Sequence, residues 1–179
     1  GGGNDEAARR ALRAYPGGMQ IGGGINPTNA PAYIAAGASH VIVTSYVFCG
    51  GRLDEARLAE MVGAVGKKAL VLDLSCRRRE PGGPFFVVTD RWQKFTELEV
   101  SEASLSSLAA LCDEFLVHAV DVEGKQSGIE TELVEQLARW SPIQVTYAGG
   151  VRSLDDLELV QTLSAGRVDV TVGSALDLF

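Results

Sequence analysis

The chain of 179 residues has few of the features that mark metal-binding, membrane-spanning or nucleic-acid-binding proteins. Its three cysteines stand in no Cys-X-X-Cys or Cys/His spacing, so no metal site is predicted, and the odd count indicates reduced thiols. No apolar run approaches the roughly 18 residues of a membrane span. The formal net charge of −7 argues against nucleic acid or an anionic membrane surface as the main partner. An anionic small molecule is still compatible, because backbone N–H groups bind phosphate whatever the net charge.

The remaining composition is that of a soluble globular domain. Hydrophobic residues make up 46% of the chain and charged residues 22%, and the length suits one domain with a sizeable core. The 21 glycines fall in clusters, which indicates turns rather than a low-complexity segment.

Short β-rich apolar runs alternate with helical stretches. The predicted strands are residues 19–22, 40–44, 69–73, 85–89, 114–120, 144–148 and 168–172. The predicted helices are residues 5–14, 28–36, 53–65, 102–111, 131–139 and 154–163, with Asn4, Ser101 and Ser153 as helix start signals. This alternation predicts a parallel sheet, either a barrel or an open doubly wound fold. Residues 85–89 are the exception, since they follow Pro81-Gly82-Gly83-Pro84 and are predicted to form a hairpin arm outside the main sheet.

An internal repeat favours the barrel. Residues 20–25 resemble residues 146–151, each with a later run that ends in a small hydroxyl residue, and Gly24 and Gly150 are 126 residues apart. This period suits a duplicated half-barrel of about four βα units. The same offset places the start of the first half before Gly1, and the opening Gly1-Gly2-Gly3 has the look of a cut end. We therefore expect one incomplete (βα)8 TIM-barrel domain over residues 1–179, with strands three to eight present and the first two strands, the helix between them and the eighth helix absent.

The glycine pairs of this repeat predict two phosphate sites. Glycine lets the backbone approach phosphate oxygens, and the loops after strands seven and eight of such barrels often hold a phosphate. The first site consists of Gly149, Gly150, Gly173 and Ser174, and its twin of Gly23, Gly24, Thr44 and Ser45. Plain βα turns are the alternative.

Several polar or aromatic residues at strand ends and loops are candidates for chemistry. Asp73 ends an apolar strand, where a carboxylate points into a barrel mouth and can act as general acid or base; a capping or turn role is the alternative. His118 and Asp121 stand at the end of the sixth strand, and either can be purely structural. Trp92 can stack on a planar substrate or serve in packing. The Arg77-Arg78-Arg79 run can attract an anionic substrate, although a solvated charge run is the commoner interpretation.

Seven segments together resemble the eukaryotic-type phosphoribosylformimino-5-aminoimidazole carboxamide ribotide isomerases of histidine biosynthesis. They are residues 22–26, 41–45, 71–77, 90–93, 115–124, 147–150 and 170–177. The resemblance covers essentially the whole chain. It implies an Amadori rearrangement of an aminoaldose to an aminoketose, on a small-molecule substrate that carries a phosphate at each end. We expect no cofactor, no metal, and a monomer when the protein is full length.

The resemblance also implies roles for individual residues. Asp73 matches the general acid that helps open the ribose ring, and the base on the first strand falls outside the chain. Trp92 matches the tryptophan that closes over the substrate. Thr44 and Ser45 with Gly24 match one phosphate site; the other matches Gly124, Gly150, Gly173 and Ser174.

Departures from the bacterial pattern leave three roles open. His118 stands where bacterial members have threonine, and we expect it to position substrate. Glu123-Gly124-Lys125 replaces Asp-Gly-Thr, and Asn26 replaces an arginine.

Two other functions stay open: the sister cyclase of the same pathway, imidazole glycerol phosphate synthase, and a non-catalytic phosphate-binding module. We expect the isolated 179-residue piece to have little or no activity, and the protein to reside in the cytoplasm or the plastid stroma.

Overall fold

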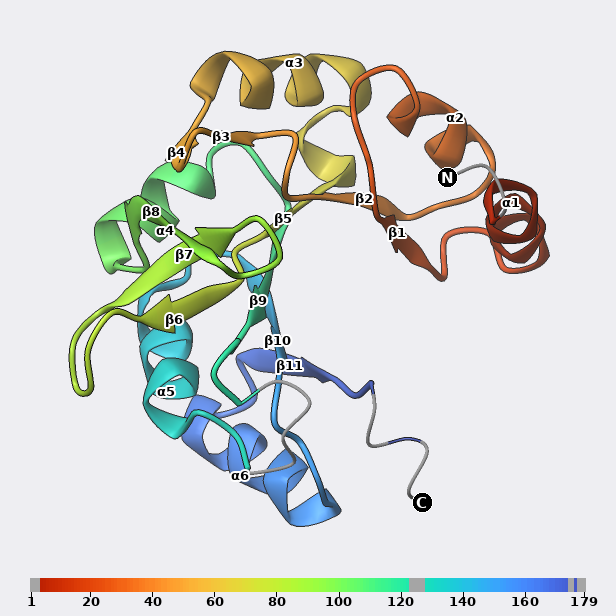
Figure 1. The fold of residues 1–179 in the computed structure, drawn as a ribbon. Coiled ribbons are helices and arrows are strands. Elements are labelled where there is room, and N and C mark those ends of the chain that lie inside the picture. The colour runs from red at the N-terminus through yellow and green to blue at the C-terminus, as the bar shows by residue number, and fades with distance from the viewer. Residues whose placement is uncertain (1–3, 123–127, 174–175, 177–179) are drawn as a thin grey trace.

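The computed structural model describes residues 4–122, 128–173 and 176. Its centre is a six-stranded parallel sheet with the strand order β1-β2-β5-β9-β10-β11. The strands are β1 (Gln20–Gly22), β2 (His40–Val43), β5 (Leu70–Asp73), β9 (Glu114–His118), β10 (Gln144–Ala148) and β11 (Val168–Thr171). These strands form an arc (Figure 1).

The helices lie along the outer side of this arc (Figure 1). They are α1 (Asp5–Ala14), α2 (Ala30–Ala35), α3 (Glu55–Val65), the 3-10 helix η1 (Lys67–Ala69), α4 (Glu102–Leu108), α5 (Thr131–Trp140) and α6 (Leu154–Ser164). Each sheet strand pairs with the sheet strand next to it in the chain, whereas a doubly wound sheet reverses its order at a switch point. The predicted α/β class with a curled parallel sheet is therefore confirmed, and the doubly wound alternative is wrong.

Two of the three predicted helix starts carry side-chain caps. The Ser101 hydroxyl accepts a hydrogen bond from Ser104 N, and the Ser153 hydroxyl accepts one from Asp156 N. Each bond satisfies an N–H group that has no partner within the helix. Asn4 precedes α1, which begins at Asp5 as predicted, although the Asn4 side chain makes no capping hydrogen bond.

The apolar core fills the space between the sheet and the outer helices. Leu72, Phe115 and Tyr147 from the sheet and Leu137 from α5 are fully buried within it. Burying side chains of this size contributes about 1.5–3 kcal/mol each. The Tyr147 hydroxyl accepts a hydrogen bond of 2.9 Å from Glu130 N, which satisfies its polar end.

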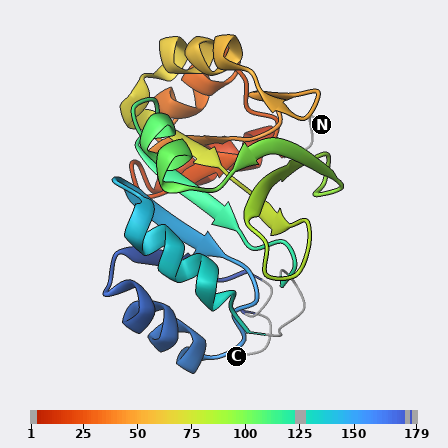
Figure 2. The ribbon, with the colours of Figure 1, turned by 90° about the vertical axis from the view of Figure 1, so that its left-hand side faces the viewer.

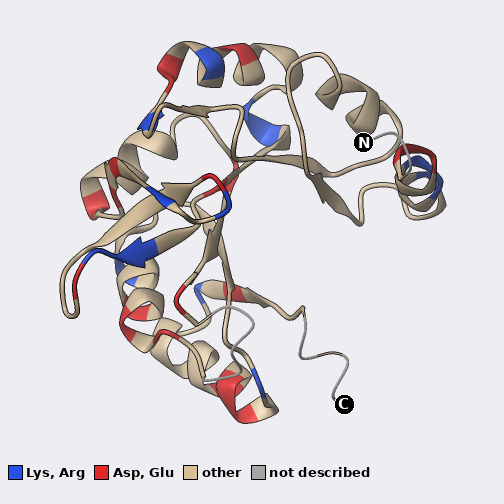
Figure 3. Cartoon of the chain, in the orientation of Figure 1, with Lys and Arg blue, Asp and Glu red and all other residues tan. Residues whose placement is uncertain are grey.

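Charged residues of both signs lie along the outer helices α1 and α3 (Figure 3). None of the helices in the described ranges has the length and apolar character needed to cross a bilayer.

An antiparallel arm interrupts the βα alternation after β5. It consists of β6 (Cys76–Arg78), β7 (Phe85–Thr89) and β8 (Lys94–Glu99). The predicted arm at residues 85–89 is confirmed, whereas β6, β8 and the small hairpin of β3 (Phe48–Cys49) and β4 (Arg52–Leu53) were not predicted. Figure 2 shows the arm on the side of the molecule toward which the arrowheads of β9 and β10 point.

The three consecutive arginines belong to this arm. Arg78 lies over the Phe85 ring at 3.9 Å, and Arg79 lies over the Phe86 ring at 4.1 Å. Arg77 forms an ion pair of 2.9 Å with Asp121. Such stacking and pairing stabilise the arm. The expectation of a solvated charge run holds for the exposed Arg79 but not for Arg77 and Arg78, which are half-buried.

Candidate functional site

The carboxyl ends of three neighbouring strands form the floor of the candidate site. Thr44 directly follows β2, Asp73 is the last residue of β5, and His118 is the last residue of β9. Because β2 pairs with β5 and β5 pairs with β9, all in parallel, these three side chains reach the same edge of the sheet. This edge is where polar strand-end residues of parallel α/β sheets meet ligands.

The Asp73 carboxylate is the centre of a hydrogen-bond network. Its Oδ1 accepts from Ser75 N at 3.0 Å and from Ser75 Oγ at 2.9 Å, and its Oδ2 accepts from Thr44 Oγ1 at 3.1 Å. His118 Nδ1 lies 3.2 Å from Asp73 Oδ1 and donates when Asp73 is ionised, since a carboxylate can only accept. With 15% of its side chain exposed, Asp73 is held in one orientation while it still faces a pocket.

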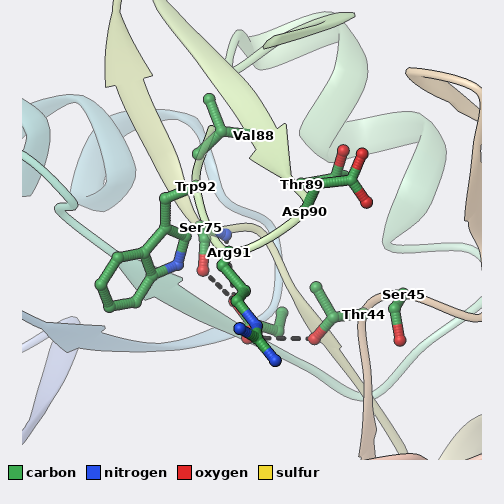
Figure 4. Close-up of a pocket in the computed structure, with 9 residues that line it drawn as sticks. Thr44, Ser45, Ser75, Val88, Thr89, Asp90, Arg91 and Trp92 are labelled. Carbon is green, nitrogen blue, oxygen red and sulfur yellow. Dashed lines mark hydrogen bonds between the residues drawn. The ribbon is translucent and has the colours of Figure 1, made fainter. Parts of the chain in front are cut away.

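The pocket above this network has a volume of about 450 Å³. This volume falls within the roughly 300–1,000 Å³ of small-molecule sites. Its walls combine the strand ends with the loop between β7 and β8 (Figure 4). The lining residues are Thr44, Ser45, Asp73, Ser75, Val88, Thr89, Asp90, Arg91 and Trp92.

The loop tip at residues 90–92 has an unusual backbone. Asp90, Arg91 and Trp92 have φ angles of 53°, 56° and 69°, in the left-handed region that residues other than glycine rarely adopt. Each such residue costs about 1–3 kcal/mol, and it persists only where the surrounding structure imposes it. The Trp92 ring centroid lies 6.4 Å from that of His118, at an interplanar angle of 39°. The tip therefore carries an aromatic ring to the pocket.

Contacts at the base of the arm hold this tip over the strand ends. Val88 N donates to the Ser75 carbonyl at 2.8 Å, which ties β7 to the segment that follows Asp73. On the other side, Glu97 N donates to the Gly51 carbonyl at 3.2 Å. The arm is thus joined both to the β5 end and to the hairpin that follows Thr44.

The first glycine pair lies in an open turn after β1. Gly23 and Gly24 have φ angles of 96° and 67°, and a Cβ at either would meet no atom within 4 Å. The Gly24 carbonyl accepts from Asn29 Nδ2 at 3.0 Å, and Asn26 Oδ1 accepts from Thr28 N at 2.9 Å. Asn26 thus orders the turn ahead of α2.

The second glycine pair is packed against another loop. A Cβ on Gly150, whose φ is +74°, would lie 2.1 Å from the Gly128 carbonyl oxygen, and Gly128 N donates to the Gly150 carbonyl at 3.2 Å. Glycine at position 150 is therefore required by the close approach of two backbones. Gly149 also has a positive φ, of 124°, and a Cβ on Gly173 would meet open space.

The structure brings together only part of the predicted site. Thr44, Ser45, Asp73 and Trp92 line one pocket, and His118 contacts Asp73 beneath it. Gly23, Gly24, Gly149, Gly150 and Gly173 do not line that pocket, so a phosphate role for them stays a prediction. Gly124 and Ser174, together with Glu123 and Lys125, lie outside the described residues.

Sequence patterns missed five of the lining residues, which are Ser75, Val88, Thr89, Asp90 and Arg91. Ser75 follows Asp73 by two positions at the same strand end, a spacing typical of a hydroxyl that donates to a nearby carboxylate. Asp90 and Arg91 directly precede Trp92 in the loop, where all three residues have a left-handed backbone.

Cys76, which follows the site in sequence, is fully buried. Burial raises the pKa of its thiol far above the ordinary value, and the charges of Asp73 and Asp121 act in the same direction. Cys76 is therefore held as a neutral thiol, unsuited to nucleophilic attack. In the part of the chain that the structure describes, no group of three or more His, Cys, Asp or Glu side chains could hold a metal ion.

Comparison with known proteins gives one family and close relatives. A family model described as "Histidine biosynthesis protein" matches residues 2–178. Three relatives share the name 1-(5-phosphoribosyl)-5-((5-phosphoribosylamino)methylideneamino) imidazole-4-carboxamide isomerase. The Medicago truncatula protein, whose name adds "chloroplastic", is 58% identical over 173 residues, which cover 97% of this chain and 55% of that protein. The Neurospora crassa protein is 50% identical over 181 residues, and the Yarrowia lipolytica protein 51% over 187; each match covers 100% of this chain and 70% of the relative.

Proposed function

Because this chain belongs to the histidine biosynthesis protein family, we propose that it forms the part of an aldose–ketose isomerase active site that contains Asp73. The substrate is the bis-phosphorylated aminoaldose for which the similar relatives are named, and the product is the corresponding aminoketose. One observation carries the proposal. The Asp73 carboxylate is fixed by Thr44, Ser75 and His118 at the floor of a pocket that Trp92 borders.

In this reaction Asp73 is the general acid. Opening the ribose ring requires a proton on the ring oxygen as its bond to C1 breaks, which leaves a protonated imine at C1. Loss of the C2 proton gives an enolamine; a proton then adds to C1 and the C2 hydroxyl loses its proton to become the ketone. A fixed carboxyl group at the ring oxygen suits the first step, since proton transfer requires hydrogen-bond reach.

His118 and Trp92 support this step in different ways. His118 Nδ1 lies 3.2 Å from Asp73 Oδ1, so a proton can pass between the two groups as Asp73 changes its charge. When Asp73 is protonated, the Ser75 and Thr44 hydroxyls can turn to accept, because a hydroxyl both donates and accepts. Trp92 offers a ring face to the imidazole carboxamide of the substrate. The base that takes the C2 proton has no counterpart that we assign in this chain.

We place the two substrate phosphates at the two glycine turns. Gly23 and Gly24 with Thr44 and Ser45 form one site, and the open space beside the two glycines leaves room for phosphate oxygens. Gly149, Gly150, Gly173, Ser174 and Gly124 form the other.

We also propose that the sheet forms strands three to eight of an eight-stranded barrel, within one domain. The sequential strand order and the curvature support this assignment. So does the pairing of β1 and β11 with a single neighbour each in the described part. The chain spans 55% of the Medicago relative and 70% of the two fungal ones, so the activity of the isolated piece is expected to be low.

The test uses the full-length protein and the purified aminoaldose, with the products separated chromatographically. We expect conversion to the aminoketose with no other co-reactant. A protein that leaves the aminoaldose unchanged but cyclises the aminoketose when ammonia is supplied would be a cyclase. A protein that binds both compounds and converts neither would be a binding module.

A further inference from the structure

We propose that Arg91 is a further substrate-binding residue, whose guanidinium pairs with the substrate phosphate held at Thr44 and Ser45. The inference rests on the proposed function and adds to it the cation that this phosphate meets. Sequence patterns gave Arg91 no role, and its place in the pocket comes from the fold of the arm.

Charge balance in the pocket is the first observation. The lining residues include the carboxylates of Asp73 and Asp90, and Arg91 is the one basic residue among them. A phosphate bound beside Thr44 and Ser45 would stand close to the Asp73 carboxylate, to which Thr44 donates. Like charges at such separations repel strongly where water is scarce, so the phosphate needs a positive group nearby.

The lack of a partner is the second observation. Other arginines near the arm are engaged: Arg77 pairs with Asp121, Arg52 pairs with Glu97, and Arg79 stacks on aromatic rings. Within residues 4–122 and 128–173, no hydrogen bond, ion pair or ring contact engages the Arg91 guanidinium. In Figure 4 its side chain extends from the loop across the pocket toward Thr44.

The backbone at the tip is the third observation. Arg91 has a φ of 56° between two neighbours that are also left-handed, which is an unfavourable arrangement for a long side chain. Such strain is common at ligand clamps, where it orients a side chain toward the ligand. A planar guanidinium at this place presents paired N–H donors, which match two phosphate oxygens.

The experiment compares variants of the full-length protein, with inorganic phosphate and the aminoaldose as separate probes. Arg91→Met keeps the apolar stem and removes the charge, Arg91→Lys keeps the charge without the fork, and Arg91→Gly also relieves the left-handed backbone. The matched control is Arg10→Met, an exposed arginine on α1. The readouts are the phosphate dissociation constant by calorimetry, KM and kcat for the aminoaldose, and Tm.

We expect Arg91→Met to weaken phosphate binding and raise KM by about 10- to 100-fold, with a smaller change in kcat, because a charge-assisted bond to a ground-state phosphate is lost. Arg91→Lys should recover part of the affinity. Arg91→Gly should lose as much affinity as Arg91→Met without a fall in Tm, which separates ligand binding from a structural role. Arg10→Met should match the wild-type protein.

Phosphate affinity and KM within about twofold of wild type in Arg91→Met would overturn the inference, and so would a parallel fall of Tm and affinity in all three variants. The outcome for the proposed function is separate. If the wild-type protein binds phosphate in an Arg91-dependent way but does not isomerise the aminoaldose, the anion site stands and the reaction fails. If the wild-type protein isomerises and Arg91→Met does so with unchanged KM, the reaction stands and the Arg91 inference fails.

Discussion

Replacing Asp73 with asparagine tests the chemistry of the site most directly. The substitution keeps the size and planarity of the side chain and removes its charge and its transferable proton. Asparagine Oδ1 can still accept from Ser75 N and Ser75 Oγ, which lie 3.0 Å and 2.9 Å from the Asp73 oxygen. Its Nδ2 can donate to Thr44 Oγ1, because the hydroxyl can turn to accept. The geometry of the pocket is therefore expected to survive.

The cost in stability is the charge-assisted part of these bonds. Hydrogen bonds to charged groups contribute about 1.5–3 kcal/mol and neutral ones about 0.5–1.5 kcal/mol. Because the Asp73 side chain is 15% exposed, solvent screens part of this difference, and we expect a net loss of about 1–2 kcal/mol. Each kcal/mol lowers Tm by about 2–4 °C in a domain of this size.

The cost in turnover is expected to be much larger. Removing a general acid lowers the rate by about 100- to 10,000-fold, equivalent to about 3–5.5 kcal/mol of transition-state free energy. The assay compares kcat for the aminoaldose, the dissociation constant of the aminoketose product, and Tm, all in the full-length protein. We expect kcat to collapse while product affinity changes little.

Asp113→Asn is the matched control. Asp113 directly precedes β9, at the opposite end of the sheet from the pocket, and its carboxylate accepts from His40 at 3.4 Å and pairs with Lys68 at 3.3 Å. This variant should lose similar stability and keep its turnover. A folded Asp73→Asn protein with kcat within about tenfold of wild type would refute the general-acid role. Joint loss of product binding and turnover would show that Asp73 is structural.

Three other expectations concern the fold. Gly150→Ala should lower the free energy of unfolding in urea by about 2–4 kcal/mol, and Gly17→Ala by only about 1–2 kcal/mol. Both glycines have φ near +75°, but only at position 150 would the added Cβ meet backbone atoms, so equal losses would contradict this. Burial raises the pKa of Cys76, and it raises the pKa of Cys112 to about 12. Because the thiols of the unfolded chain ionise at lower pH than the buried ones, the free energy of unfolding should be constant below about pH 9 and fall as the pH rises toward 12. Measured by urea unfolding at several pH values, the free energy of unfolding should decline less steeply with pH in Cys112→Ala than in the wild-type protein. The same dependence on pH in both proteins would argue against this. Arg79→Met should lower Tm by the equivalent of about 1 kcal/mol, since its stacking and a backbone hydrogen bond on the arm are lost; an unchanged Tm would mean that solvent replaces both.

Local sequence patterns predicted the parallel framework well. The helix Asp5–Ala14 and the strands Phe85–Thr89 and Gln144–Ala148 have the predicted bounds, and most other elements differ by one to three residues at an end. Apolar runs and helical periodicity depend on neighbours in the chain, so they can be interpreted without the fold. The same holds for Asp73, because a carboxylate that ends a buried parallel strand must lie at the carboxyl edge of the sheet.

The sequence also determined the family and the candidates Thr44, Ser45, Asp73 and Trp92, which line one pocket. Only the tertiary structure decided how that pocket is closed. Arg91 reaches the pocket on the left-handed tip of the arm, and backbone hydrogen bonds join the arm to Ser75 and Gly51.

Gly150 and the consecutive arginines show the same division. The glycine pattern predicted a turn, but the requirement for glycine at 150 comes from the Gly128 carbonyl of another loop. The consecutive arginines predicted a solvated charge run, whereas in the folded arm Arg78 lies over the Phe85 ring and Arg79 over the Phe86 ring. Spacing along the chain reports which face of an element a residue occupies, whereas these contacts depend on which loops and strands the fold places side by side.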